Sequence, residues 1–412
     1  MIYVHIPFCR SFCTYCDFYS EVAPKCREAV DFRIQDERFG CFGKALSSEI
    51  AMRGTEISDE TDTLYIGGGT PSVLPLSFFE SLMYSLREAG HGGPYDEFTV
   101  EVNPEDIVEK GEAYVEGLLR LGVNRISMGV QSFDDGVLRF MNRRHDAETA
   151  KRAYAVLENA GVGNISIDLI FGLPQLSELQ WSDTLEKALD ISPSGMLPQH
   201  ISSYQLSVEP GSMLAKMAAK GLFKEASDEL CGRQYEILCD RLKQSEYDHY
   251  EISNFARPGY KAMHNSAYWS HVPYVGFGPG AHSFRKIPSD SSRSGPVMPG
   301  PRNSGNINGF PGWENATYVR QWNRPDLNSY IADPASVQEH ETLDEEQLIL
   351  EKIMLALRTS VGISEDFLRR HCDLSALDRA FATGDLVLNP DGNVRIPESR
   401  FFISDSIISD IV

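Results

Sequence analysis

The first half of the chain alternates short apolar runs with segments whose apolar residues recur every three or four positions. The first pattern predicts buried β-strands, and the second predicts amphipathic helices. Each strand–helix unit is about 35 residues long, which favours an α/β fold with an all-parallel sheet. Residues 19–43, which include Pro24 and Gly40, interrupt the pattern and are predicted to be irregular. The strands are predicted at the N-terminal run and at residues 63–66, 97–102, 125–130, 166–171 and 200–206, and the helices at residues 42–53, 76–89, 109–121, 135–141, 147–160, 178–189 and 227–244.

Six alternating strands can curve into a partial TIM barrel or form a doubly wound open sheet, and periodicity alone does not decide between them. At 412 residues the chain exceeds one typical core, so we expect a large domain with smaller additions. The predicted divisions are residues 1–245, residues 246–342 with a Pro-, Gly- and Ser-rich insertion at 286–315, and residues 343–412. Two helices and a hairpin in the last segment predict a small winged-helix-like α+β module.

Composition narrows the classes of function. A hydrophobic content of 42% fits a folded globular chain, and a net charge of −21 opposes binding to nucleic acid. No apolar run approaches the roughly 18 residues that a membrane span needs, so we expect no integral membrane segment. A signal peptide would have to contain Cys9, so we expect instead a cytoplasmic protein whose remaining cysteines are reduced.

Three cysteines directly follow the first predicted strand. Cys9, Cys13 and Cys16 are spaced C-x3-C-x2-C. Three thiolates can hold a 4Fe–4S cluster and leave one iron without a protein ligand, where a small molecule can chelate and accept an electron. The pair Cys13 and Cys16 alone would also suit a zinc site or a thioredoxin-like redox site, but no second ligand pair follows at matching spacing. The triplet therefore favours an iron–sulfur cluster over a zinc ion or buried thiols.

The residues around the triplet carry a family resemblance. With the aromatic Tyr15 before Cys16, the triplet resembles the radical S-adenosylmethionine superfamily. The whole string from Tyr3 to Phe18 is similar to the anaerobic coproporphyrinogen III oxidases and the related HemW-type haem chaperones. This resemblance implies a six-stranded partial TIM barrel. It also implies that S-adenosylmethionine binds the open iron and is cleaved there to methionine and a 5′-deoxyadenosyl radical, so an electron donor for the cluster is required.

The same resemblance implies contacts to S-adenosylmethionine. The turn Gly67-Gly68-Gly69-Thr70 is not a phosphate loop, because no Gly-Lys-Ser/Thr follows, and it matches the family's methionine-binding turn. Glycines there would let the backbone approach a ligand closely. Glu101 ends the third predicted strand in a segment similar to the family's Glu-x-x-Pro, which implies a contact with the ribose hydroxyls; a solvated or salt-bridged strand-end acid is the alternative. The implied contacts are Tyr3 against the nucleotide, Tyr15 as a second aromatic, and Gly68, Gly69, Thr70 and Glu101.

Three further positions match residues that touch a second S-adenosylmethionine in the oxidases. Gln131 ends the fourth predicted strand, Arg143 follows 12 residues later, and Asp168 lies in the fifth strand. An amide, a guanidinium and a carboxylate at one rim could bind any zwitterion. A buried ion pair between Arg143 and Asp168 with a purely structural role is the alternative.

Two features distinguish the chaperones from the oxidases. The oxidases carry a further cysteine two positions after the third cluster cysteine, where this chain has Phe18. The chaperones share Phe at that position and a His-Asn-x-x-Tyr-Trp motif, which runs here from His264 to Trp269. Imidazole is a normal axial haem ligand, and Tyr268 and Trp269 could stack on a porphyrin, so His264 is a candidate for haem contact. A histidine that satisfies backbone groups in a turn is the alternative.

The sequence therefore predicts a radical-SAM haem chaperone that binds haem as cargo and delivers it to an apo-haemoprotein. The alternative is an oxygen-independent coproporphyrinogen III oxidase, which would convert propionates to vinyl groups. A zinc-stabilised binding protein without redox chemistry is a third hypothesis. Whether the chain is an enzyme stays open at this point.

Overall fold

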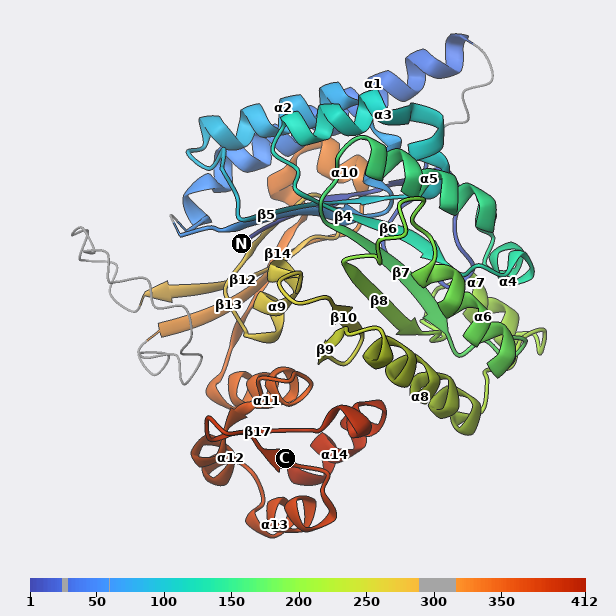
Figure 1. Ribbon diagram of the computed structural model, residues 1–412. Helices are drawn as coiled ribbons and strands as arrows, with labels where there is room; N and C mark the ends of the chain where they lie inside the picture. Colours follow the sequence, from blue (N-terminus) through green and yellow to red (C-terminus); the bar gives the residue numbers. More distant parts are fainter. Residues whose placement is uncertain (24–28, 59, 289–315) are drawn as a thin grey trace.

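A nine-stranded sheet forms the centre of the protein (Figure 1). The computed structural model describes residues 1–23, 29–58, 60–288 and 316–412. The strand order in the sheet is β11-β1-β4-β5-β6-β7-β8-β10-β9. These strands are β1 Ile2–Ile6, β4 Thr63–Gly68, β5 Glu97–Val102, β6 Arg125–Gln131, β7 Ile165–Phe171, β8 His200–Gln205, β9 Asp248–Glu251, β10 Asn254–Ala256 and β11 Val275–Phe277, and a separate short pair is formed by β2 Phe8–Cys9 and β3 Glu21–Val22.

The six strands from β1 to β8 in this order follow one another along the chain and are all parallel. A doubly wound sheet reverses its strand order at a switch point, so that alternative is wrong. The predicted α/β fold with a central parallel sheet is confirmed. Every residue of β6 is buried, as expected for a central strand of a parallel sheet.

Three strands beyond residue 245 extend the sheet at its two ends. β11 pairs in parallel with β1, while β10 pairs antiparallel with both β8 and β9. The sheet therefore crosses the domain boundary expected at residue 245. Within the described residues no pairing joins β9 to β11, so the sheet is open.

The first helix is longer than the sequence predicts. α1 spans Ala29–Arg53, so the interpretation of residues 29–43 as irregular is wrong. Gly40 lies inside this helix, although glycine costs a helix interior roughly 1 kcal/mol relative to alanine. Phe39 and Phe42 are buried on one side of α1, and this packing outweighs the glycine.

Helices cover the sheet. Figure 1 shows α1, α2, α3 and α5 along one side of it, and α6 and α8 beside the end formed by β7 to β9. The seven helices predicted between and after the strands are confirmed, α1 and α3 with earlier starts. None of the helices in the described part of the chain is both long and apolar enough to cross a membrane. The helices up to residue 269 are α1 Ala29–Arg53, α2 Leu76–Glu88, α3 Pro104–Arg120, α4 Asp135–Phe140, α5 Ala147–Asn159, α6 Glu178–Leu189, α7 Met213–Ala219, α8 Asp228–Gln244 and α9 Met263–Trp269.

A three-stranded antiparallel sheet follows, which the sequence analysis did not predict. It consists of β12 His282–Pro288, β13 Ala316–Asn323 and β14 Gln338–Leu343, with α10 Leu327–Ala332 between the last two strands. Residues 286–288 of the predicted insertion belong to β12, so they are not loop. Residues 289–315 and Pro24 lie outside the described residues.

The C-terminal segment packs below the central sheet in Figure 1. The two predicted helices and the hairpin of β16 and β17 are present, and α13 and α14 are additional. The segment is joined to the sheet edge by backbone hydrogen bonds, from Ile252 N to the Arg358 carbonyl at 3.1 Å and from Ser360 N to the Tyr250 carbonyl at 2.9 Å. Its elements are α11 Glu345–Leu357, β15 Ile363–Ser364, α12 Glu365–His371, α13 Leu374–Thr383, β16 Val387–Leu388, β17 Asn393–Arg395 and α14 Ser404–Ile411.

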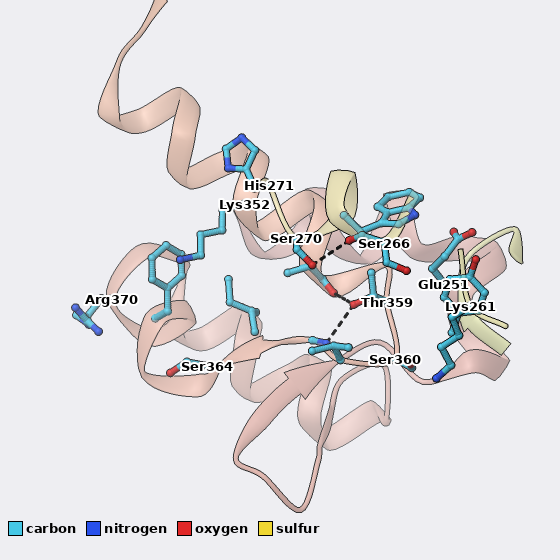
Figure 2. A pocket seen from close by; sticks show the side chains of 17 residues that line it. Glu251, Lys261, Ser266, Ser270, His271, Lys352, Thr359, Ser360, Ser364 and Arg370 are labelled. Carbon is cyan, nitrogen blue, oxygen red and sulfur yellow. Dashed lines mark hydrogen bonds between the residues drawn. The ribbon is translucent and has the colours of Figure 1, made fainter. Parts of the chain in front are cut away.

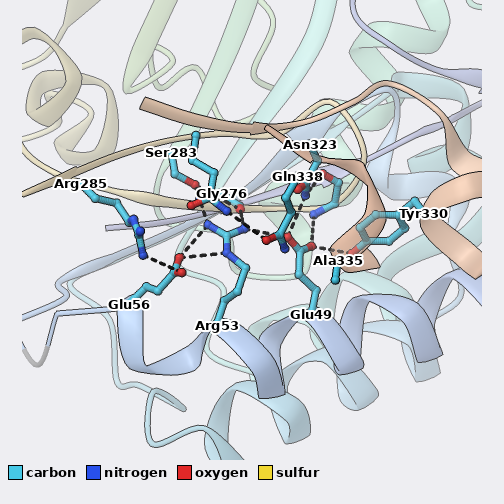
Figure 3. Close-up of polar contacts among 12 residues, drawn as sticks. Glu49, Arg53, Glu56, Gly276, Ser283, Arg285, Asn323, Tyr330, Ala335 and Gln338 are labelled. Carbon is cyan, nitrogen blue, oxygen red and sulfur yellow. Dashed lines mark hydrogen bonds and ion pairs between the residues drawn. The ribbon is translucent and has the colours of Figure 1, made fainter. Parts of the chain in front are cut away.

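A buried polar network attaches α1 to the second half of the chain (Figure 3). Glu49 is fully buried and accepts hydrogen bonds from Tyr330 at 2.7 Å and from Asn323 at 2.8 Å. Its carboxylate also pairs with Arg53 at 2.7 Å, and the Arg53 guanidinium donates to the Gly276 carbonyl at 2.9 Å. The partners of this ion pair come from α10, β13 and β11, so Glu49 and Arg53 together hold three segments against α1.

Replacing Glu49 by alanine should lower the free energy of unfolding by about 3 kcal/mol, because removing one partner of a buried pair leaves the other charge uncompensated. The matched control is Glu116→Ala, which breaks an exposed i,i+4 pair with Arg120 and should cost less than about 1 kcal/mol. Denaturant unfolding of both variants measures the difference. Equal losses in the two variants would show that the network contributes no more than a surface pair.

Candidate functional site

A cavity of about 500 Å³, called here the first cavity, opens at the carboxyl ends of the parallel strands. This is the edge where parallel α/β sheets of the barrel type gather their functional groups. The wall combines the predicted cluster loop with the ends of β4 to β8. Its residues include Cys9, Cys13 and Cys16 from the loop, and Tyr65, Gly68, Glu101, Arg125, Ser127, Gln131, Asp168, Ser202 and Tyr204 from the strands.

The loop that carries the cysteines is fixed by hydrogen bonds to its backbone. The Thr14 amide donates to the Met141 carbonyl at 3.1 Å, and the Thr14 carbonyl accepts from the Leu214 amide at 2.8 Å. The Asn142 side chain donates to the Phe12 carbonyl at 2.7 Å. The loop is therefore tied to the end of α4 and to the start of α7.

The thiols have different surroundings. The Thr70 hydroxyl donates to the Cys9 sulfur at 3.4 Å, and the Arg143 guanidinium donates to the Cys13 sulfur at 3.4 Å. Burial raises the pKa of Cys16 to about 12, and burial also raises the pKa of Cys9. These two thiols are therefore protonated at neutral pH in the metal-free protein.

The arrangement of thiols suits an iron–sulfur cluster. Within the described ranges, no three His, Cys, Asp or Glu side chains lie close enough together to hold a single metal ion. A tetrahedral zinc ion draws its sulfurs to about 2.3 Å from one centre, whereas a 4Fe–4S cluster takes each cysteine at a separate iron corner. All three thiols line the first cavity, and three thiolates are the donor set of a 4Fe–4S cluster that keeps one iron without a protein ligand.

The glycine turn is required by the protein's own packing. A Cβ on Gly68 would lie 2.6 Å from the His5 ring, and a Cβ on Gly69 would lie 2.6 Å from the Phe8 carbonyl oxygen. Both contacts are with the segment that leads into the cysteine loop, so close approach to a ligand is not the first reason for these glycines. Gly68, Gly69 and Thr70 nevertheless all line the first cavity.

Glu101 projects into the first cavity from β5. One carboxylate oxygen accepts the Tyr65 hydroxyl at 2.7 Å, and the other accepts the Gly68 amide at 3.2 Å. Burial raises the pKa of Glu101 to about 7, and the neighbouring Asp168 acts in the same direction. Carboxylate oxygens have further lone pairs, so both can still accept hydroxyl donors such as those of a ribose.

Arg143 links three parts of the cavity wall. Besides its contact with Cys13, its Nη2 donates to Asn103 and to the Gly129 carbonyl, both at 2.7 Å. Burial acts to lower the pKa of Arg143, but Tyr15 and Cys13 raise it above its ordinary value. The guanidinium therefore stays charged beside the thiols.

Gln131 and Asp168 lie on the same wall. Gln131 ends β6 beside a β-bulge with φ 67°, a left-handed conformation that is uncommon for a residue other than glycine. Burial raises the pKa of Asp168, whose carboxylate accepts the Ser127 hydroxyl at 3.3 Å. Because the hydrogen bonds of Arg143 go to Cys13, Asn103 and Gly129, the alternative of a buried Arg143–Asp168 ion pair is wrong for the described structure.

The two predicted aromatic contacts lie differently. Tyr15 lines the first cavity, but Tyr3 is not among the described residues of its wall. The Tyr3 hydroxyl bonds to Nδ1 of His5 at 3.0 Å, and its ring centroid lies 6.2 Å from that of Tyr65. Tyr3 therefore lies beside Tyr65, which is on the cavity wall, but Tyr3 itself is not on the wall. This arrangement gives no support to a direct contact of Tyr3 with a nucleotide.

His264 lies in the core and not on the wall of the first cavity. Its Nδ1 is hydrogen-bonded to the Thr63 hydroxyl at 2.7 Å and its Nε2 to the Tyr268 hydroxyl at 3.0 Å. Burial lowers its pKa to about 3, so the ring is neutral. An axial bond to haem would require one of these hydrogen bonds to break. The alternative, a histidine satisfied within the protein, describes this conformation, although its partners are side chains and not backbone groups.

Trp269, from the same motif, lines a second cavity of about 310 Å³ between α9 and the C-terminal segment (Figure 2). The wall of this second cavity includes the apolar side chain of Phe367 and the cations Lys261 and Arg370. The two cavities share no lining residue, but α9 contributes to both, with Asn265 on the first and Trp269 on the second.

Sequence reasoning missed several residues of the first cavity. Asn103 accepts a hydrogen bond from Arg143 and donates one to the Thr70 hydroxyl at 3.2 Å, so it links Arg143 to the glycine turn. Arg125 and Ser127 also face the cavity from β6. The available signal was the period of two along β6, because alternate residues of a strand lie on one face and Gln131 was already a candidate.

Comparisons with known proteins extend this picture. Residues 3–188 match the family model described as the radical SAM superfamily. The chain is 32% identical over 362 residues to a protein of Synechocystis sp. named heme chaperone HemW. The aligned region covers 88% of this chain and 78% of that protein. It is 33% identical over 282 residues to the Escherichia coli heme chaperone HemW, covering 68% of this chain and 69% of that protein. The chain belongs to the HemW family of the radical SAM superfamily.

A solved structure gives a fold counterpart for this HemW-family chain. Coproporphyrinogen III oxidase HemN from Escherichia coli, described as a radical SAM enzyme, superposes with a TM-score of 0.72 at 21% identity, covering 99% of this chain and 89% of that chain. At this level of identity the likeness shows the fold alone. The family resemblance inferred from Cys9, Cys13 and Cys16 and their flanks is confirmed.

Glu101 should give the unfolding free energy a defined pH dependence. Because its pKa is raised from 4.5 to about 7, the folded protein binds this proton more tightly than the unfolded chain does. The stabilisation is fully present below about pH 4.5 and is lost as the pH rises through about 7. From about pH 4.5 to pH 8, the unfolding free energy of wild type should therefore fall by about 3 kcal/mol relative to that of Glu101→Gln, which has no carboxyl to titrate.

Urea unfolding of cluster-free wild type and of Glu101→Gln at the two pH values measures this shift. The matched control is Glu116→Gln, which replaces an exposed acid and should show no comparable trend. A pH-independent difference between wild type and Glu101→Gln would show that the pKa of Glu101 is not raised in the folded protein.

Proposed function

We propose that this HemW-family protein is a haem chaperone that holds a 4Fe–4S cluster and S-adenosylmethionine, binds haem and passes it to apo-haemoproteins. The observation that carries the proposal is the gathering of three cysteine thiols around one cavity, in a chain whose relatives are named heme chaperones. The cluster that the family implies would sit on Cys9, Cys13 and Cys16. A cluster with one open iron supplies a single electron to a bound sulfonium.

The chain's own residues would hold and tune that cluster. Thr70 and Arg143 already donate to the sulfurs of Cys9 and Cys13. Hydrogen bonds to cluster sulfurs raise the reduction potential, because they stabilise the more negative reduced state. Arg143 also holds Asn103, so the cluster loop and the end of β5 would move as one unit.

The remaining wall of the first cavity would position S-adenosylmethionine. We assign Gly68, Gly69 and Thr70 to its methionine part and Glu101 to its ribose hydroxyls, because all four residues line the cavity beside the thiols. Tyr15 would lie against the bound molecule. Gln131, Arg143 and Asp168 would serve a second zwitterion further along the same wall.

The haem contact is assigned to α9. Trp269 lines the second cavity, where its aromatic ring could stack on a porphyrin. His264 would join as an axial ligand only after its hydrogen bond to Tyr268 breaks. Haem is the cargo in this proposal, and the apo-haemoprotein acceptor and the electron donor are partners that bind from outside.

We further infer that the central sheet is a six-stranded partial TIM barrel and that residues 343–412 are a winged-helix-like module. The sequential parallel order of β1 to β8 and the HemN fold support the first inference. The order of α11, β15, α12, α13, β16 and β17 supports the second. The module would cover the second cavity, which it helps to line. A cytoplasmic location suits a protein whose described cysteines are all free thiols.

The second candidate is an oxygen-independent coproporphyrinogen III oxidase. The HemN fold favours it, but Phe18 stands where those oxidases carry a further cysteine, and its side chain is 66% exposed at the cavity wall. The zinc-stabilised binding protein is the third candidate, and metal analysis tests it directly.

Replacing Cys9, Cys13 or Cys16 by alanine should remove most of the bound iron and sulfide, because a cluster held at three corners does not survive the loss of one ligand. Anaerobically reconstituted wild type should hold about four iron and four sulfide per chain. The control Cys41→Ala should match wild type, because Cys41 lies in α1 and not on the cavity wall. Zinc as the bound metal, or unchanged iron in the three variants, would contradict the cluster assignment.

Haemin titration should show a spectral shift with wild type and no decarboxylation of coproporphyrinogen by the same preparation. Trp269→Ala should bind haemin up to about tenfold more weakly, since aromatic stacking contributes about 1 kcal/mol. The control Trp322→Ala removes a tryptophan of β13 that does not line the second cavity, and should bind as wild type does.

His264→Ala belongs in the same series. It should lower the melting temperature, because it leaves the buried Thr63 hydroxyl without its partner. Loss of haemin binding at an unchanged melting temperature would instead establish His264 as a direct ligand. Robust turnover of coproporphyrinogen by wild type would replace the chaperone proposal with the oxidase.

A further inference from the structure

Arg125 is a buried cation at the inner end of the first cavity. It begins β6, it is 1% exposed, and it lines the cavity wall. Its buried Nε has no hydrogen-bond partner. Buried polar groups are otherwise almost always satisfied, and an unpaired buried charge is strongly unfavourable. The Nε–H of this guanidinium is therefore a donor available to a molecule that enters the cavity.

The neighbouring carboxylates do not neutralise Arg125 by contact. The carboxylate of Glu101 on β5 accepts hydrogen bonds from the Tyr65 hydroxyl and the Gly68 amide. Asp168 on β7 accepts the Ser127 hydroxyl. Arg125 interacts with both acids only through space. Its charge lowers the pKa values of Glu101 and Asp168, but burial raises them more strongly.

We propose that Arg125 binds the carboxylate of a ligand that enters the first cavity. A guanidinium presents a planar pair of donors that matches a carboxylate. The flanking Glu101 and Asp168 disfavour a dianion such as phosphate, but they tolerate a monoanion and attract the ammonium group of a zwitterion. The identity of the ligand rests on the proposed function, in which the carboxylate of S-adenosylmethionine and a propionate of haem share this chemistry.

Binding measurements on cluster-loaded protein test the proposal with two pairs of probes. The first pair is S-adenosylmethionine and its decarboxylated analogue, followed by equilibrium dialysis. The second is haemin and haemin dimethyl ester, followed by absorbance. The variants are Arg125→Gln, Arg125→Lys, which keeps the charge, and the control Arg120→Gln, which replaces an exposed arginine of α3.

Arg125→Gln should weaken binding of one carboxylate probe by about tenfold or more, the usual effect of losing a hydrogen bond to a charged group. Arg125→Lys should recover part of the affinity, and Arg120→Gln should bind as wild type. The probe that lacks the carboxylate should bind wild type and all variants equally. Loss confined to S-adenosylmethionine identifies that molecule as the source of the carboxylate, and loss confined to haemin identifies a propionate.

The melting temperature of ligand-free protein separates binding from a structural role. If Arg125 awaits a ligand, Arg125→Gln should melt at the wild-type temperature or above it, and should lose the rise in melting temperature that the probe gives wild type. A lower melting temperature together with unchanged affinities for both carboxylate probes would overturn the proposal. Wild type that binds neither S-adenosylmethionine nor haemin would instead contradict the proposed function, so the two failures differ.

Discussion

Two backbone hydrogen bonds join the end of β1 and the start of β2 to the glycine turn after β4. The amides of Gly69 and Thr70 donate to the carbonyls of Ile6 and Phe8, at 2.8 and 2.7 Å. The short parallel pair of β2 and β3 holds the same segment from its other side. The cysteine loop has little regular structure of its own, so these contacts decide where Cys9 lies relative to the cavity. The glycine turn is therefore first a support for the loop, and a side chain on Gly69 would push the loop away.

The parallel sheet supplies the rest of the site by bringing distant residues to one edge. Glu101, Gln131 and Asp168 belong to three successive strands whose carboxyl ends meet at the first cavity. The same geometry buries charged groups that water would otherwise solvate, and burial raises the pKa values of Glu101 and Asp168. At a pKa of about 7 the Glu101 carboxyl is partly protonated at physiological pH, which weakens its repulsion of Asp168 in the same cavity.

Much of this could be predicted from local patterns, because strands, helices and ligand spacings are encoded over a few residues. The six parallel strands β1, β4, β5, β6, β7 and β8 and the cysteine triplet are of this kind. Elements that depend on distant partners could not be predicted: β11 is three residues long and is a strand only because Ile2 to Val4 pair with it. Gly40 misled the helix assignment, since the packing of Phe42 is a tertiary effect. The inward position of Arg125 could be predicted from the period of two along β6. That its Nε has no hydrogen-bond partner could not be predicted, because this depends on residues of other strands.

The helix α9 shows why a motif and its geometry must be considered together. The carboxylate of Glu97 accepts the amides of Met263 at 2.7 Å and His264 at 3.0 Å, which fixes the start of this short helix to β5. The His264 ring then bonds to Thr63 on β4, so the histidine anchors the helix to the sheet. Asn265 and Trp269 follow on the walls of the first and the second cavity. Any displacement of α9 large enough to free the His264 ring therefore reshapes both cavities, since each takes a wall residue from this one helix.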